Sequence, residues 1–114
     1  MDMKVFALKA CDTCRKALKE LRAANRDFTL IDVRDDGLSA DDIAMIIDAV
    51  GFDKALNRRS TTWRNLEDNE KATLTAATAA TLISAHPTLL KRPAISDGHA
   101  TTVGWDAAAK AVWL

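Results

Sequence analysis

The amino-acid sequence predicts a single α/β domain over residues 1–114, in which a four-stranded mixed sheet carries a helical insertion between its second and third strands. Three observations lead to this fold class. A strand, a helix and a second strand follow one another within the first 33 residues. The stretch from about 38 to 90 contains helical patterns and nothing that looks like a strand. Two short β-rich segments return after Pro93, before a final helical pattern.

The N-terminal third of the chain has the pattern of a β-α-β unit. Residues 3–8 form a short apolar run that fits a buried strand, and residues 28–33 form a second β-rich run. Residues 13–24 between them are predicted to be a helix with an apolar face made of Cys14, Ala17, Leu18, Leu21 and Ala24. The two strands of such a unit are expected to be parallel, with a right-handed crossover.

The middle of the chain is predicted to be helical. Ser39 is the expected N-cap of a helix and Gly51 the expected residue at its end. Between them, apolar residues follow the spacing i, i+3, i+4 and i+7 at Ile43, Ile46, Ile47 and Val50. Residues 58–63 lose this period and are predicted to be a polar loop. Pro87 ends or restarts a helix predicted within residues 69–85, whose shared face holds Ala79, Leu82, Ile83 and His86.

The C-terminal part is predicted to complete the sheet. Asp97-Gly98 is expected to form a two-residue hairpin turn between strands at residues 94–96 and 99–103. This hairpin would add antiparallel strands to the parallel pair and so produce the mixed sheet. Gly104 breaks the last strand, and the final helix is predicted to bury a face made of Trp105, Ala108, Ala109 and Val112.

Charge and hydropathy exclude several function classes. The chain has 16 Lys and Arg and 16 Asp and Glu residues, so its formal net charge is zero. Non-specific binding to nucleic acid and polybasic attachment to a membrane both need an excess of cations. No apolar run approaches the roughly 20 residues of a membrane span, and the N-terminus lacks the pattern of a signal peptide. We therefore expect a cytoplasmic protein that contacts neither nucleic acid nor membrane directly.

Cys11 and Cys14 have the spacing of a C-x-x-C motif and lie where the first strand ends and the first helix begins. The free N–H groups and the positive dipole of a helix N-terminus favour a thiolate, so Cys11 is the predicted nucleophile. Cys14 lies one turn further in, on the apolar face, and is the predicted resolving thiol. A C-x-x-C at this place in a β-α-β unit is typical of a thioredoxin-like redox motif.

Two other interpretations of the cysteines stay open. They can be small apolar residues that pack at the start of a helix. They can also bind a metal together with His86 and His99, but twelve residues separate these histidines, whereas the second ligand pair of a zinc site is usually close in sequence. We expect no metal.

Arg92 is the predicted cation opposite the cysteines. Pro93 is a candidate for a cis peptide bond, which would bend the chain and bring Arg92 toward the turn that holds Cys11. The fork of donors on an arginine suits an oxyanion, and Arg58 and Arg59 are the predicted second side of the anion site. These residues belong to a local group of cations that suits a small anion better than a polymer: Lys54, Arg58, Arg59, Arg64, Lys91 and Arg92.

Three motifs carry a resemblance to a known family: Cys11-Asp-Thr-Cys14-Arg-Lys-Ala17, Arg59-Ser-Thr-Thr-Trp63-Arg64 and Leu90-Lys-Arg92-Pro93-Ala94-Ile95. With these motifs in order, the chain resembles the arsenate reductase (ArsC)/Spx family and looks most like its small YffB-type branch. The likeness runs over nearly the whole chain. It implies a thioredoxin-like sheet with a helical insertion, which is the fold class that the residue patterns predict.

The resemblance also implies a function. It implies a thiol-dependent oxidoreductase in which Cys11 is the nucleophile, Arg92 holds the anion and a loop arginine, Arg58 or Arg59, assists. No bound cofactor is expected. Glutathione is the implied co-substrate and glutaredoxin an implied partner, with a small thiol or an oxyanion as substrate.

The sequence differs from arsenate-reducing members of the family in two places. Those members have a further arginine near the last strand, where this chain has Thr102-Val103-Gly104-Trp105, and they generally lack a cysteine at the position of Cys14. The C-x-x-C is shared instead with Spx regulators, which sense oxidation through that disulfide and bind the C-terminal domain of the RNA polymerase α subunit. Gly51 lies near a glycine associated with that contact. A redox-sensing transcriptional regulator is therefore the alternative function.

Overall fold

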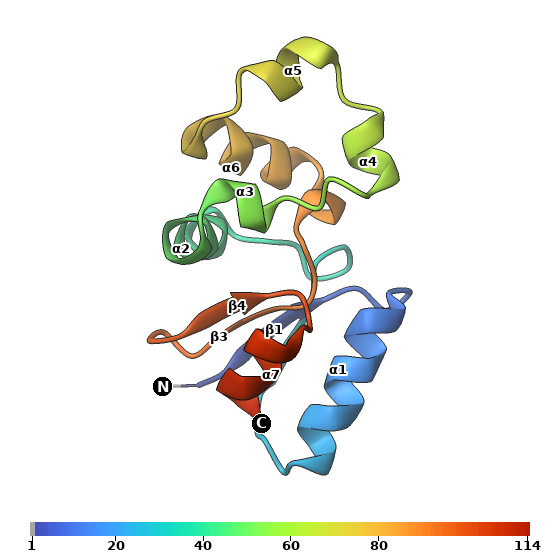
Figure 1. Ribbon diagram of the computed structural model, residues 1–114, viewed down its shortest axis with the longest axis vertical. Helices are drawn as coiled ribbons and strands as arrows, with labels where there is room; N and C mark the ends of the chain where they lie inside the picture. The colour runs from blue at the N-terminus through green and yellow to red at the C-terminus, as the bar shows by residue number, and fades with distance from the viewer. Residues whose placement is uncertain (1) are drawn as a thin grey trace.

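The computed structural model of the chain describes residues 2–114 and contains a four-stranded mixed sheet of order β2-β1-β3-β4 (Figure 1). Strand β1 (Lys4–Ala7) pairs in parallel with β2 (Thr29–Asp32) and antiparallel with β3 (Ala94–Ser96). Strand β4 (Thr101–Val103) pairs antiparallel with β3. The predicted fold class is confirmed: the sheet is mixed, and helices fill the chain between β2 and β3.

The two faces of the sheet bury separate cores, because successive residues of a strand point to opposite sides. Val5 and Ala7 of β1 pack with α1 (Asp12–Ala23) and α7 (Ala107–Trp113) on one face. Phe6 between them packs against the helical insertion on the other face. Figure 1 shows the result, with α1 and α7 on one side of the sheet and the insertion on the other.

Helix α1 joins the two parallel strands as predicted. It buries Cys14, Ala17 and Leu21 against the sheet. Ala24 was predicted on the same face, but it lies just after the helix, at the C-cap, and is exposed. Asp32, the last residue of β2, is buried although it is charged.

The helical insertion comprises α2 (Ala40–Val50), α3 (Phe52–Ala55), α4 (Thr61–Arg64), α5 (Asp68–Ala72), α6 (Ala76–Ala85) and the 3-10 helix η1 (Pro87–Leu89). The predicted N-cap of α2 is confirmed, since the Ser39 hydroxyl accepts a hydrogen bond from the Asp42 N–H at 3.1 Å. Gly51 ends α2 with a φ of +87°, a conformation that favours glycine.

The insertion differs from the sequence-based prediction in three details. The predicted polar loop contains α4, because Ser60 caps a helical turn by accepting from the Trp63 N–H at 3.1 Å. The helix predicted within residues 69–85 is split into α5 and α6, because Thr75 is an N-cap that starts a new helix. His86, predicted on the buried face, is exposed at the end of α6.

The C-terminal hairpin and helix also depart from the prediction in detail. The turn is a four-residue loop over 97–100 rather than two residues, because the Asp97 carboxylate accepts hydrogen bonds from the N–H groups of His99 and Ala100, both at 2.8 Å. Helix α7 starts after its N-cap Asp106 and buries Ala109 and Trp113; the predicted face members Ala108 and Val112 are exposed. Among residues 2–114, no helix has the length and apolar character needed to cross a bilayer.

Candidate functional site

The two cysteines lie at the N-terminus of α1, beyond the carboxyl end of β1. Cys11 is the N-cap residue, with extended backbone angles (φ −88°, ψ 117°), and its carbonyl accepts the Arg15 N–H at 3.0 Å. Its side chain is half-buried, whereas Cys14 is fully buried in the core beneath α1. Both thiols are free. The outer sulfur is therefore open to a substrate and the inner one is shielded from it.

Arg92, which comes shortly before β3, lies at the same end of the sheet as the two cysteines. Phe6 pairs with Ala94 in antiparallel register, so the residues after β1 run alongside Arg92 and Pro93. The Arg92–Pro93 peptide bond is cis, and Pro93 is buried. The pairing of β1 with β3 therefore brings Arg92, which is 81 positions away in sequence, to the residue that caps α1.

Two backbone carbonyl oxygens accept hydrogen bonds from the Arg92 guanidinium and hold it in place. Its Nη1 donates to the carbonyl of Thr88 at 2.7 Å and to the carbonyl of Leu90 at 3.1 Å. Its Nε is buried and has no hydrogen-bond partner within residues 2–114. A buried donor without a partner is uncommon and marks a place where an acceptor is missing. The guanidinium thus keeps donor capacity for a negative group beside Cys11.

The surroundings of Cys11 favour its thiolate. Partial burial is the largest single influence and raises the pKa, because a charged sulfur is less well solvated there. The backbone N–H and the thiol of Cys14, followed by the charge and hydrogen bonding of Arg92, outweigh it and lower the pKa of Cys11 below its ordinary value. The Cys11 sulfur does not complete a side-chain capping hydrogen bond, yet the N–H of Cys14 still favours the ionised form.

Cys14 behaves in the opposite way. Its burial, assisted by the neighbouring Cys11 sulfur, raises the pKa of Cys14 to about 12, although the backbone N–H of Leu8 and the charge of Arg92 act against this rise. Two thiols that interact this closely share their titration, and one ionised sulfur disfavours a second. Of the two thiols, Cys11 is therefore the first to ionise as the pH rises, and Cys14 stays a thiol when it does.

This division predicts selective alkylation. In the native protein iodoacetamide should modify Cys11 and leave Cys14 unmodified, and the rate should rise with pH to a plateau whose midpoint lies below that of a free cysteine, since only the thiolate reacts. Tandem mass spectrometry of the modified chain at a series of pH values measures both. The same chain in denaturant is the control, and it should react at both cysteines. Native modification of Cys14 first would contradict the assignment.

Arg58 and Arg59 have their known contacts with residues other than the cysteine pair, within residues 2–114. Among the contacts recorded for residues 2–114, Arg58 forms an ion pair with Asp53 and lies over the Trp63 ring at 5.4 Å. Arg59 is exposed, and its backbone N–H donates to the Asn57 side chain at 3.1 Å. The structure thus brings Cys11, Cys14 and Arg92 together, while the predicted role of Arg58 and Arg59 in binding an anion stays a prediction.

Asp32 is a site residue that the sequence analysis missed. Its carboxylate accepts hydrogen bonds from the N–H groups of Arg34 (2.9 Å), Asp35 (2.8 Å) and Lys9 (3.3 Å). The Asp35 N–H is the main reason why the pKa of Asp32 is lowered, despite burial. Asp32 thereby ties the end of β2 to the loop that leads to Cys11. Its place at the end of a strand parallel to β1 is the signal that could have indicated it.

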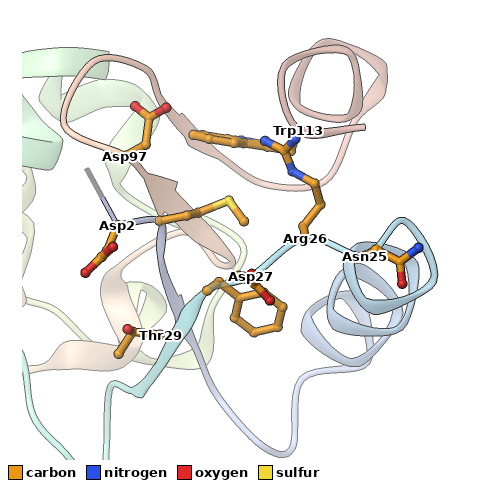
Figure 2. Close-up of a pocket in the computed structure, with 9 residues that line it drawn as sticks. Asp2, Asn25, Arg26, Asp27, Thr29, Asp97 and Trp113 are labelled. Carbon is orange, nitrogen blue, oxygen red and sulfur yellow. The ribbon is translucent and has the colours of Figure 1, made fainter.

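A cavity beside the first residues of the described chain does not enlarge this site. This cavity, of about 450 Å³, lies at the opposite end of the sheet and is shown in Figure 2, with Arg26, Asp97 and Trp113 among its lining residues. Its residues come from the segments before β1 and β2, the start of β2, the turn after β3 and the end of α7, whereas Cys11 follows β1. Nor does the described part of the chain contain a group of three or more His, Cys, Asp or Glu residues that could hold a metal; His86 and His99 are both exposed.

Comparisons with known proteins place this arrangement in a family. The model of the ArsC family matches residues 6–111. An uncharacterized protein of Haemophilus influenzae is 39% identical over 102 residues, which is 90% of either chain. The solved YFFB (PA3664) protein is 32% identical, with a TM-score of 0.91 and 98% of each chain covered. An arsenate reductase (ArsC) related protein from Brucella melitensis is 30% identical, with a TM-score of 0.76, 99% of this chain and 94% of the other.

These matches cover enough of the chain to show to which family it belongs. The family match includes Cys11, Cys14 and the Arg92–Pro93 bend, so it spans the whole candidate site as well as both halves of the sheet. The fold, with its thioredoxin-like sheet and helices between β2 and β3, agrees with that match. This chain, with its cysteine pair at the start of the first helix, belongs to the ArsC family.

Proposed function

We propose that the protein is a thiol oxidoreductase that uses Cys11 as its nucleophile, Cys14 as its resolving thiol and Arg92 as its anion-binding group. The observation that carries this proposal is the buried, unpartnered Nε of Arg92 beside a half-exposed cysteine whose pKa is lowered. A missing acceptor next to a nucleophile is what a site for a negatively charged adduct or substrate requires. The arsenate reductase related protein at 30% identity supports a reductase over other thiol chemistry.

The first half of the reaction is a thiol–disulfide exchange. The Cys11 thiolate attacks one sulfur of a disulfide substrate, forms a new S–S bond to it and expels the other substrate sulfur as a thiolate. Arg92 stabilises the thiolate before attack and faces negative charge at the site. The product of this half is a mixed disulfide on Cys11, at the open side of the pair.

The second half uses Cys14. Attack by its thiolate on the Cys11 sulfur forms the Cys11–Cys14 disulfide and releases the second substrate thiolate, so that the pair has given two electrons. A pKa of about 12 would make Cys14 a poor nucleophile at the outset. Once the Cys11 sulfur is in a mixed disulfide it has no charge, and one cause of the raised pKa disappears. The Leu8 N–H and the charge of Arg92, which lower the pKa, remain. The pKa of Cys14 is thus lowered once Cys11 has reacted, although burial, the largest cause of the rise, remains.

Glutathione is the proposed electron donor. Two glutathione molecules reduce the Cys11–Cys14 disulfide and leave as glutathione disulfide, which balances the two electrons delivered to substrate. Glutaredoxin is a proposed partner in this half, and the glutathione-rich cytoplasm is the proposed setting. A small oxyanion is the second substrate class that the free donor of Arg92 suits, with Arg58 or Arg59 as further cationic groups.

A trapping experiment tests the proposal. In the Cys14→Ser variant, exposure to glutathione disulfide should leave one glutathione bound to Cys11, because the resolving thiol is absent. The wild-type chain should instead accumulate with an internal Cys11–Cys14 disulfide. Intact mass and tandem mass spectrometry distinguish the two species. Cys11→Ser is the control and should acquire no glutathione, since Cys14 is fully buried.

The same experiment separates catalysis from regulation. A chain that forms the internal disulfide but shows no turnover with glutathione and a disulfide substrate would fit a redox-sensing regulator that binds the RNA polymerase α subunit. Absence of any adduct on Cys11 would contradict both functions, because both depend on a reactive outer thiol.

A further inference from the structure

The position of the Arg92 guanidinium depends on a short segment of backbone. Both of its acceptors, the carbonyls of Thr88 and Leu90, lie within the four residues that precede it. Both carbonyls accept a hydrogen bond from the same nitrogen, Nη1. The positions of these two oxygens therefore determine where the other N–H donors of the guanidinium point. Whatever fixes the segment from Thr88 to Leu90 therefore fixes the cation that faces Cys11.

The helical insertion holds this segment at two points. The first is backbone pairing: Leu56 and Leu90 form an isolated antiparallel bridge, and the Asn57 N–H donates to the Leu89 carbonyl at 2.7 Å. The second is a hydrogen bond between two side chains, the hydroxyls of Thr62 and Thr88, with 2.7 Å between their Oγ1 atoms. The second contact acts on the residue whose carbonyl makes the shorter bond to Arg92.

The position of Thr62 is itself fixed by contacts at the start of its helix. It lies in α4, whose start is fixed by Ser60; the Ser60 hydroxyl accepts the Trp63 N–H and donates to the Asn57 carbonyl at 2.7 Å. Thr62 and Thr88 are both half-buried, so loss of one hydroxyl would leave the other with less access to water as a substitute partner. A continuous set of contacts therefore runs from α4 through the two threonines to Arg92.

We propose that Thr62 is a positioning residue for the cysteine site: its hydroxyl fixes Thr88, and the Thr88 carbonyl holds the Arg92 guanidinium in place beside Cys11. The helical insertion then anchors the Arg92 guanidinium of the site, in addition to covering the sheet. The inference deepens the proposed thiol chemistry and rests on it for the part that Arg92 plays.

Alkylation of Cys11 measures the effect without any substrate. Thr62→Val removes the hydroxyl at nearly constant shape, and the iodoacetamide rate of Cys11 at neutral pH should fall about two- to fivefold, the range that loss of one neutral hydrogen bond permits. Thr62→Ser keeps the hydroxyl and should react at close to the wild-type rate. Thr61→Val, an exposed neighbour in the same helix, is the matched control and should leave the rate unchanged.

A double-mutant cycle shows whether Thr62 acts through Arg92. In an Arg92→Gln background, Thr62→Val should slow alkylation no further, because the group that it positions is gone. An unchanged rate in Thr62→Val, or an equal slowing with and without Arg92, would overturn the inference. Lack of turnover with glutathione in the wild type would instead refute the proposed function, while the alkylation rates still decide the role of Thr62.

Discussion

Replacing Cys11 with serine is expected to reduce glutathione-linked turnover by roughly a thousandfold or more, the scale of loss seen when a covalent nucleophile is removed. A serine hydroxyl is not ionised at neutral pH and cannot form a disulfide, so neither half of the proposed reaction can take place. The measurement is the rate of disulfide reduction in an assay that couples glutathione disulfide to NADPH consumption through glutathione reductase.

The fold should tolerate this substitution. Cys11 is the N-cap of α1, a position that serine favours. Ser39 and Ser60 already fill the same role in α2 and α4, where each accepts an N–H from three residues on at 3.1 Å. Thermal unfolding of Cys11→Ser should therefore occur at or above the wild-type temperature. Wild-type turnover in a folded Cys11→Ser chain would show that the chemistry lies elsewhere.

The sequence predicted those parts of the fold that depend on local periodicity. The strand-helix-strand order and the burial of Cys14, Ala17 and Leu21 follow from residue spacing alone, and the structure has them. The errors lie where a polar side chain competes with periodicity. Thr75 starts a new helix within an Ala- and Thr-rich stretch, and the Asp97 carboxylate widens a turn from two residues to four.

The residue types of the candidate site could be predicted from the sequence, but the contacts that hold Arg92 in place could not. A C-x-x-C at a strand-helix junction and an arginine before a proline are visible in the sequence. The two carbonyls that hold Arg92 are not, because any residue carries a carbonyl and its identity gives no signal. The bond between Thr62 and Thr88 joins residues 26 positions apart and depends on how α4 packs against η1. Contacts of this kind arise from tertiary packing.

Arg92→Gln is the second substitution with a large expected effect, a loss of about ten- to a hundredfold in turnover, because a hydrogen bond to a charged group contributes about 1.5–3 kcal/mol. Glutamine keeps a hydrogen-bond donor but removes the positive charge. This charge is one of the influences that lower the pKa of Cys11. The pH profile of Cys11 alkylation should accordingly move to higher pH: with the cation gone, less thiolate is present at any given pH below the plateau.

Arg34→Gln is the matched control for this charge. Arg34 is exposed just after β2, at the same end of the sheet, so the substitution removes an equal charge with the same change of side chain. Its interaction with Cys11 would pass largely through solvent, where salt screens it, and both the turnover and the pH profile should stay close to wild type. Arg92→Lys should fall between wild type and Arg92→Gln, because a lysine retains the charge but lacks the planar fork that bonds the Thr88 and Leu90 carbonyls. Equal profiles for wild type and Arg92→Gln would mean that the helix N-terminus alone ionises Cys11, and Arg92 would then have no part in activating the thiol.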